Sequence, residues 1–431
     1  MNTTESVFDS KEYKRSRYGY VFFCGFEYFV TLLIIDSFLA RLLSSMGMGD
    51  GAIGIISSIM SMGFLFNLTT LVLMKRLKKV KKLVIVGECL CLVFFAALYL
   101  LPFLDASLSV KTFLAVFCIT AGYLSKFTVS SILYKWANDF VAPEKRATFT
   151  GFKEMTSVLS GIGITLGAGL LMDRFAEKGD LSTAFLIIAV SILIFDVCCF
   201  VSLMNIQDAM ITAGDPKKQE FRTVLKKTLG NRSFRHVIIM TAIADASRYT
   251  AYSFYGTYKN QELMMSMSLI SIVNVVGSLM YVVLAQPVGR YSDRTSYAKG
   301  LRLCYIFAAA AYLVNVFCTP KTWYLMIVFT VLFGINNAGR NANTNNILYS
   351  YVDAEYFPQA MAIRNAIAGL IGFLCALGAG KLLTALQDTG NQLFGVTIYG
   401  QQILSLIAFL MMLFGVIYDK TVVEKQKIML Q

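Results

Sequence analysis

The sequence is poor in charged residues and almost lacks histidine. Only 15% of its 431 residues are charged, and His236 is the single histidine. By contrast, 56% of the residues are hydrophobic, more than a soluble chain of this length could bury away from water. The composition therefore excludes an ordinary soluble protein and predicts an integral membrane protein.

Enzyme and cofactor signatures are also missing. The nine cysteines form no Cys-x-x-Cys pair and have no histidine at a metal-ligand spacing, so we interpret them as small buried hydrophobic residues. No Walker-type glycine loop is present, which argues against direct use of ATP. Because no nucleophile, metal cluster or acid pair stands at a catalytic spacing, we predict no enzyme activity, no cofactor and no metal.

The net charge of +13 suggests a nucleic-acid partner, but the distribution of the charge argues against one. Lysine and arginine concentrate in alternate loops, 26 on one side and seven on the other. This asymmetry is typical of the positive-inside rule and predicts cytoplasmic termini. The hydrophilic N-terminal residues are not followed by a small-residue cleavage site, so we expect the first apolar run to be retained. We predict a multi-pass protein of the bacterial plasma membrane.

Twelve runs of about 20 apolar residues predict twelve transmembrane helices. All six prolines fall at the predicted ends or connections, as helix breakers should. The runs lie near 18–43, 51–74, 83–103, 112–137, 148–172, 181–205, 236–258, 266–287, 301–318, 323–349, 361–385 and 393–418.

The longest connection divides the runs into two sets of six. We predict an N-terminal bundle over 1–205, a cytoplasmic linker over 206–235 and a C-terminal bundle over 236–431. Within the linker, apolar residues recur at helical spacing between Phe221 and Leu229, which fits either a short helix on the inner leaflet or a solvated linker. Ile-Leu-Tyr and Leu-Gly-Ala-Gly motifs recur in the same order in both halves. This internal repeat makes the fourth and tenth spans equivalent, as well as the fifth and eleventh.

Two loops carry a family resemblance. The segment from Gly289 to Asp293-Arg294, followed by Lys299, resembles the signature loop of the major facilitator superfamily, and Trp136 to Arg146 is similar to that superfamily's connection between its fourth and fifth spans. The resemblance implies two pseudo-symmetric six-helix bundles and alternating-access transport, with the first, fourth, seventh and tenth spans lining a central cavity. The equivalent loop of the first half has Lys75-Arg76 without the glycine and the acid. If that loop is a latch, Glu154 or Asp139 would have to supply its anion.

The tenth span is unusually polar. Asn336, Arg340 and Asn343 share one helix face, and a second asparagine stripe follows Asn337 and Asn341. Unpaired polar groups in lipid cost kilocalories each, and an arginine near the bilayer centre costs at least ~2.5 kcal/mol. We therefore expect this helix to line a wet cavity.

Lys126 and Arg340 lie deep in equivalent spans. Lys126 is about 16 Å from the cytoplasmic end of its span by helical rise, too far for its amine to reach water. Either the two cations bind a polar or anionic substrate, or each is held in a structural ion pair. In the seventh span, Asp245 and Arg248 are close enough to pair, and a tyrosine stripe that includes Tyr252 fits either packing or substrate contact.

Acidic residues in the spans suggest ion coupling. Glu27 lies near mid-membrane in the first span, where a partly apolar cavity would favour its protonated form, so we predict that it carries the coupled proton. We interpret Asp36 and Asp196 as charge-balancing residues. Lys153, Glu154 and Arg364 lie near the cytoplasmic starts of the fifth and eleventh spans, where gate salt bridges are favoured.

These patterns predict a monomeric secondary active transporter that moves a small polar organic solute, anionic or sugar-like, by proton-coupled symport. Its partners would be the solute, a proton or another cation, and the lipid bilayer. The alternatives are a proton-linked exporter of drugs or metabolites and a sensor of the same fold that does not transport. The predicted substrate-binding residues are Lys126, Asp245, Arg248, Tyr252, Asn336, Asn337, Arg340 and Asn341. The predicted gating residues are Asp139, Lys153, Glu154, Asp293, Arg294 and Arg364.

Overall fold

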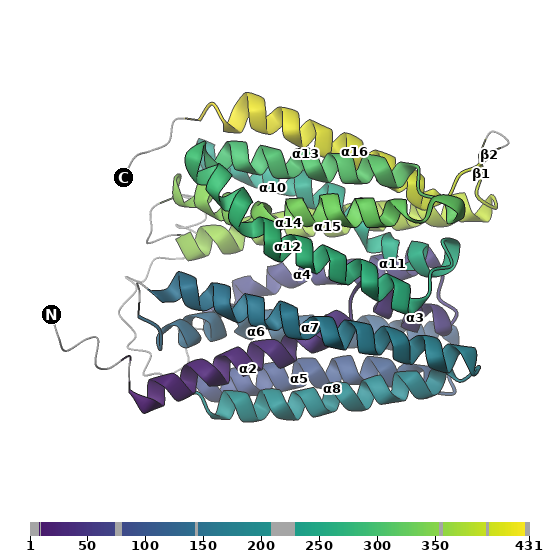
Figure 1. Cartoon of the computed structure of the whole chain (residues 1–431), viewed down its shortest axis with the longest axis horizontal. Coiled ribbons are helices and arrows are strands. Elements are labelled where there is room, and N and C mark those ends of the chain that lie inside the picture. Colours follow the sequence, from purple (N-terminus) through teal and green to yellow (C-terminus); the bar gives the residue numbers. More distant parts are fainter. Residues whose placement is uncertain are drawn as a thin grey trace. The chain divides into compact units, whose positions relative to one another are not determined.

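The computed structural model is built almost entirely from helices (Figure 1). It describes residues 8, 10–73, 80–142, 145–207, 229–352, 357–393 and 396–426. The chain forms two compact units. Unit 1 comprises Met1–Gly47 and Phe66–Pro216, and unit 2 comprises Met48–Leu65 and Lys217–Gln431. Residues 75–79 of the predicted basic loop 75–82 and most of the linker, including nearly all of its predicted short helix, lie outside the described residues.

Unit 1 is a helical bundle. Within it, α5 packs against α6 and α8, and α2 packs against α7 and α8. Its elements are α2 (Lys11–Leu33), α3 (Asp36–Ser45), α5 (Val80–Leu100), the 3-10 turn η1 (Leu101–Phe103), α6 (Leu108–Asn138), α7 (Arg146–Glu177) and α8 (Leu181–Met204).

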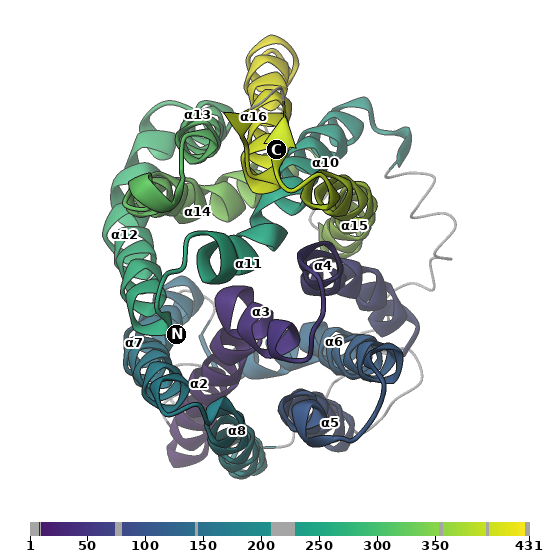
Figure 2. The same cartoon turned by 90° about the vertical axis from the view of Figure 1, so that its right-hand side faces the viewer.

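Unit 2 is a second helical bundle, which Figure 2 shows nearly end-on. In this unit α13 contacts α14 and α16, and α10 contacts α15 and α16. Helix α4 (Asp50–Leu73) begins here, although it comes from the first half of the sequence. The helices are α10 (Arg232–Ala251), η3 (Tyr252–Phe254), α11 (Tyr255–Thr257), η4 (Tyr258–Glu262), α12 (Met267–Arg294), α13 (Tyr297–Val316), η5 (Pro320–Thr322), α14 (Leu325–Tyr349), α15 (Phe357–Asp388), α16 (Gly400–Tyr418) and η7 (Asp419–Val423). A short hairpin pairs β1 (Gln392–Leu393) with β2 (Val396–Thr397).

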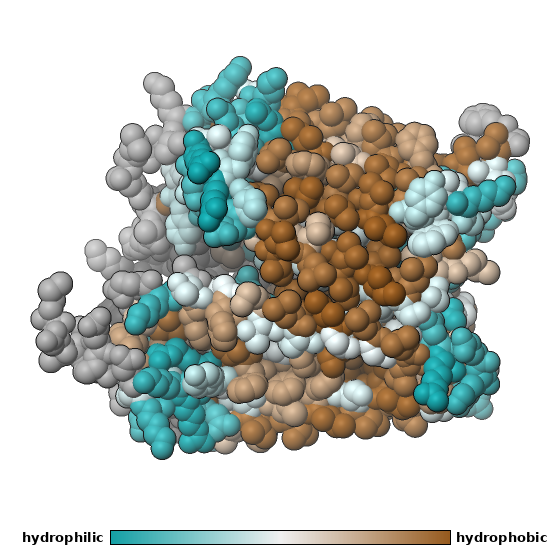
Figure 3. All heavy atoms as spheres, viewed as in Figure 1, coloured by the Kyte–Doolittle hydropathy of each residue, from teal (hydrophilic) through white to brown (hydrophobic). Residues whose placement is uncertain are grey.

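The helices have the length and apolar surface of membrane spans. Among the described residues, eight are long and apolar enough to cross a membrane, and nine if α2 and α3 count as one bent span. In unit 2, hydrophobic side chains cover the middle of α12 and α13, whereas hydrophilic residues gather at both helix ends (Figure 3). Each of the twelve predicted runs contains a helix, but α4, α10 and α14 are not among the nine. In α14, Arg340 and the asparagines make the helix more polar than its neighbours.

Two predicted spans are broken rather than continuous. Helices α2 and α3 meet at an angle of 47°, and Asp36 at the start of α3 has φ +50°. Aspartate is one of the few residues that tolerate this left-handed conformation, and its carboxylate is favourable in the first turn of a helix. In unit 2, the regular helix α10 ends at Ala251. The chain then continues through the 3-10 turn η3, the short helix α11 and the π-helix η4. The prediction of one continuous helix over 18–43 and another over 236–258 is therefore wrong, because each segment contains more than one helical element.

Another boundary also differs from the prediction. We placed the end of the eighth span at Pro287, but α12 runs through this proline to Arg294. The proline removes one backbone donor, and the remaining ladder of the 28-residue helix holds the segment together. The signature segment that begins at Gly289 is thus helical rather than a loop.

Glycines allow close contact between helices at corresponding places in the two units. A Cβ atom on Gly161 of α7 would lie 2.7 Å from Tyr28 of α2, and one on Gly372 of α15 would lie 2.5 Å from Tyr249 of α10. Real Cβ atoms do not approach this closely, so both tyrosine rings use space that only glycine leaves open. These contacts fix the helices that carry the charged residues described next.

Candidate functional site

Unit 1 contains a charged pair between its first and fourth spans. Lys126 of α6 forms an ion pair with Glu27 of α2, and both side chains are 20% exposed. The hydroxyl of Thr31 donates to Glu27 Oε1 at 3.1 Å and accepts from Lys126 Nζ at 3.3 Å. This partly buried cation thus has the internal anion that its depth in the helix required. The proposed proton carrier and the proposed substrate cation are partners.

A second acid, Glu88 of α5, lies close to this pair. Its side chain is 2% exposed, and its Oε2 atom has no hydrogen-bond partner among the described residues. The charges of Glu27 and Lys126 both act on its carboxyl group. Our sequence analysis missed Glu88 because it stands alone in an apolar run. The sequence could have identified it, because any ionisable residue inside a membrane span is a candidate functional residue.

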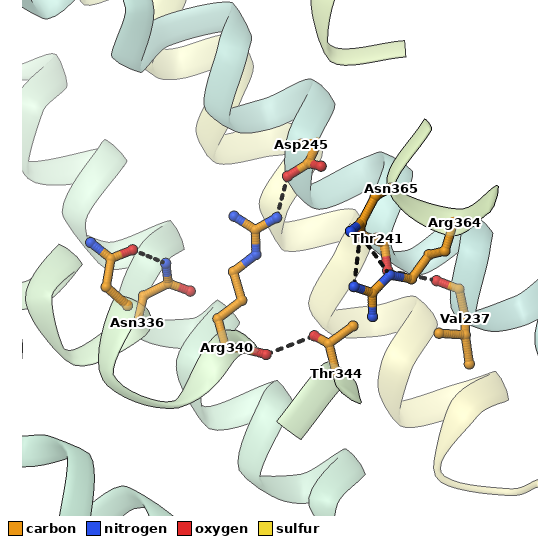
Figure 4. Close-up of polar contacts among 9 residues, drawn as sticks. Val237, Thr241, Asp245, Asn336, Arg340, Thr344, Arg364 and Asn365 are labelled. Atoms are coloured by element: carbon orange, nitrogen blue, oxygen red, sulfur yellow. Dashed lines mark hydrogen bonds and ion pairs between the residues drawn. The ribbon is translucent and has the colours of Figure 1, made fainter. Parts of the chain in front are cut away.

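Unit 2 contains a second pair, again between its first and fourth spans. Arg340 of α14 forms an ion pair with Asp245 of α10, and the side chains are only 12% and 13% exposed (Figure 4). The backbone oxygen of Arg340 accepts a hydrogen bond from Thr344 at 2.7 Å. The predicted partner of Asp245 on its own helix was Arg248, but its ion pair is with Arg340. This pair fixes α14 to α10 at the level of the asparagine-rich face.

Arg364 of α15 lies beside this pair and has a different kind of partner (Figure 4). It is 6% exposed and donates to the side-chain oxygens of Asn345 at 3.1 Å and Asn365 at 2.7 and 3.1 Å. Within the part of the chain that the structure describes, no carboxylate forms an ion pair with it. We predicted that Arg364 could reach the membrane interface, whereas the structure buries it next to Asp245 and Arg340, which both act on it electrostatically.

Arg248 lies among aromatic rings. Its guanidinium group is 5.4 Å from the ring centre of Tyr252 and 5.9 Å from that of Tyr249. Tyr252 in turn stacks on Phe333 of α14, with ring centres 5.3 Å apart. Cation–π contacts of this kind stabilise a partly buried arginine without a carboxylate. The tyrosine stripe of the seventh span therefore packs against α14 and also contacts a cation.

The predicted polar face of α14 is buried in part. Asn336 and Asn343 are 1% and 3% exposed, and the amide nitrogen of Asn336 donates to Asn337 at 3.4 Å. The Oδ1 atom of Asn336 is buried without a hydrogen-bond partner among the described residues. Asn341, which we predicted to bind substrate, is exposed. The predicted stripe of Asn336 and Asn343 is thus buried, whereas Asn341 of the second stripe is exposed.

The predicted gating residues are scattered. Asp139, Glu154, Asp293 and Arg294 are exposed. Lys153 lies over the ring of Tyr20, with its amine 5.7 Å from the ring centre. The predicted gate contacts of these residues stay a prediction, and Lys75 and Arg76 of the first-half loop lie outside the described residues.

The fold and the paired charges define a class of protein, a polytopic helical membrane protein with buried ion pairs in two bundles. Residues 237–429 match the sequence model of the Major Facilitator Superfamily. This match spans a little under half of the chain and lies in its C-terminal part, which is therefore similar in sequence to this superfamily. No curated protein sequence matches the chain.

Solved structures with the same fold are transporters. A mutant of the nucleoside transporter NupG has a TM-score of 0.73 at 11% identity, and the match covers 94% of this chain and 98% of that one. A bacterial homologue of the lysosomal transporter Spinster has a TM-score of 0.68 at 12% identity, covering 95% and 97%. A bacterial homologue of the iron transporter ferroportin has a TM-score of 0.65 at 15% identity, covering 94% and 98%. The family and these structures indicate a transporter and not an enzyme.

Proposed function

We propose that this protein is a secondary active transporter that carries a small anionic organic solute together with a proton. The observation that supports an anionic cargo most strongly is the buried charge of Arg364. This guanidinium group contacts only amide oxygens among the described residues, and the nearby Asp245 is already paired with Arg340. A carboxylate or phosphate on the solute would supply the missing counter-charge.

The charges near Arg364 suggest how the solute binds. Two guanidinium groups, those of Arg340 and Arg364, share one carboxylate, that of Asp245. Arginine presents a planar fork of donors that matches carboxylate and phosphate groups. An incoming anion would take the free donor positions of Arg364, and the neighbouring asparagine amides would bind hydroxyl or carbonyl groups of the solute.

The similar structures do not indicate which solute this protein carries. They include a nucleoside transporter and a bacterial homologue of an iron transporter, so this fold carries chemically different solutes. The choice of an anion therefore rests on the residues of this chain. Export of a hydrophobic drug agrees less well with this site, because an apolar solute would leave the charge of Arg364 without a counter-charge.

The proposal is tested by uptake into proteoliposomes with matched probes. Glucuronate is compared with glucose, and uridine monophosphate with uridine, under an imposed pH gradient. We expect the acidic member of at least one pair to be preferred by about tenfold or more, equivalent to ~1.4 kcal/mol. Equal uptake of both members would refute an anionic cargo, and a rate that ignores collapse of the pH gradient would refute proton coupling.

Variants then assign the site. Arg364→Gln keeps a polar side chain but removes the charge, and it should abolish the preference for the acidic probe. Arg340→Ala should impair uptake as well, because Asp245 would then compete with the anion for Arg364. Lys321→Gln is the matched control, since Lys321 is an exposed cation in η5 of the same unit. If Arg364→Gln keeps the preference of the unchanged protein, the site assignment is wrong.

A further inference from the structure

Glu88 is held firmly in the interior of unit 1. It lies in α5, and the preceding residue, Gly87, packs so closely on α6 that a Cβ atom there would lie 2.6 Å from Val129. Val129 is one helical turn from Lys126. The Glu88 side chain is 2% exposed, and its Oε2 atom finds no hydrogen-bond partner in the described chain. At least the Oε2 atom of this carboxyl group is therefore cut off from solvent where it lies.

The charges around Glu88 do not balance if it is ionised. Glu27 and Lys126 act on it directly and already neutralise each other. Other titratable groups feel its charge, but none is a cation: Cys24 of α2, Cys89 and Cys91 of α5, and Cys199 of α8. Asp196 of α8 acts on Cys89 and would only add negative charge. An ionised Glu88 would thus be a second carboxylate competing for one lysine.

We propose that Glu88, rather than Glu27, binds the coupled proton, and that this proton controls the availability of Lys126. The inference rests on the proposed proton-coupled function and names the residue that performs the coupling. Glu27 is less suited to the role, because its carboxylate is bound by both Lys126 and Thr31. Among the described residues, Glu88 forms no hydrogen bond with either of them.

The coupling step is a simple proton transfer. A proton from water forms an O–H bond with the Glu88 carboxylate, while Lys126 keeps its own proton throughout. With Glu88 protonated, Lys126 faces one carboxylate, and its remaining donors can bind another acceptor. With Glu88 ionised, two carboxylates hold the lysine. Proton binding therefore makes the donors of Lys126 more available to an acceptor, and proton release makes them less available, which is the sign that symport requires.

Infrared spectroscopy of the purified protein in liposomes tests this without any substrate. A protonated carboxyl group gives a C=O stretching band that shifts in heavy water and disappears as the pH rises. We expect this band in the unchanged protein and in the control Asp105→Asn, which removes an exposed acid of the same unit. Glu88→Gln should lose it while retaining its helical circular dichroism.

The outcomes separate the proton site from the wider function. A band that persists in Glu88→Gln overturns the inference. If that variant does not fold, Glu88→Asp must shift the band, and an unchanged band overturns the inference equally. Loss of the band together with no uptake of any anionic probe would reject the proposed function but retain Glu88 as a proton site.

Discussion

The charged clusters of the two units are built on one plan and differ in the sign of their excess charge. In each unit an acid on the first span pairs with a cation on the fourth, Glu27 with Lys126 and Asp245 with Arg340. In each unit the first span also breaks within about three turns after the acid. Unit 1 then adds a carboxyl group, that of Glu88, whereas unit 2 adds a guanidinium group, that of Arg364. The comparison teaches that a repeated scaffold can provide a proton site in one half and an anion site in the other.

Removing the cation from each pair should give the largest difference between the units. Lys126→Ala leaves one buried carboxyl group, Glu88, and one partly buried, Glu27, without their ion-pair cation, and we expect a loss of ~3–5 kcal/mol at neutral pH. Arg340→Ala should cost less, because Arg364 can turn to Asp245. The loss in Lys126→Ala should shrink as the pH falls, since the two acids can then take up protons. Thermal unfolding in detergent at several pH values measures both variants.

Two results would break this comparison. Equal losses in both variants would mean that Arg364 does not compensate for Arg340. A double variant, Lys126→Ala with Glu27→Ala, should recover part of the stability, since it removes the unpaired charge along with its partner. No recovery would mean that the pair contributes through packing rather than through charge.

The glycine contacts should be sensitive in both units. Gly161→Ala and Gly372→Ala place a methyl group against Tyr28 and Tyr249, and overpacking of this kind costs ~1–3 kcal/mol. Gly163→Ala and Gly378→Ala are matched controls on the same helices, because nothing lies within 4 Å of their added Cβ atoms. Thermal unfolding compares the four variants. Equal shifts in variants and controls would show that the close contacts do not position these helices.

The smallest expected effect lies in a polar cluster of unit 2 around Gln387. Gln387 donates from one amide nitrogen to Asp50 at 2.9 Å and to Glu262 at 3.4 Å. Burial raises the pKa of Glu262, and the charge of Asp50 raises it further, against the lowering effect of hydrogen bonds from Gln387 and Asn391.

The sign of the resulting pH effect follows from the raised pKa of Glu262. The folded protein holds this proton more tightly than the unfolded chain, so the stabilisation is complete below the unfolded pKa of about 4.3 and is lost as the pH rises through the folded value. Because Glu262 is partly exposed, we expect this stabilisation to be less than ~1 kcal/mol. Hydrogen exchange in η4, corrected for intrinsic rates, should show opening that increases with pH. Glu262→Gln should remove the trend and Asp388→Asn, an exposed acid nearby, should keep it.

Hydropathy predicted most of the fold, because long apolar segments must be helices in lipid. It did not predict the breaks. Ile34, Ile35 and Tyr252 are neither proline nor glycine, so nothing local marks the ends of α2 and α10. The bends depend on contacts within each bundle, which a single sequence does not reveal.

The candidate site was predictable where depth alone demanded a partner. Lys126 and Arg340 were expected to need an anion or water, and the structure supplies Glu27 and Asp245. The pairing itself could not be read from the sequence, since it joins residues about a hundred positions apart. Arg364 was placed near the interface by counting helical rise from an assumed helix start, and that estimate cannot show which side of the helix is covered.

Proton uptake on anion binding tests the division of roles between the units most directly. Purified protein in weakly buffered solution is mixed with the acidic probe preferred in the uptake assay, and a pH dye reports proton exchange while calorimetry reports binding. We predict that the unchanged protein takes up a proton when it binds the anion, that Glu88→Gln binds without proton uptake, and that Arg364→Gln binds weakly or not at all. Unchanged proton uptake in Glu88→Gln, or unchanged binding in Arg364→Gln, would contradict the assignment of the proton to unit 1 and of the anion to unit 2.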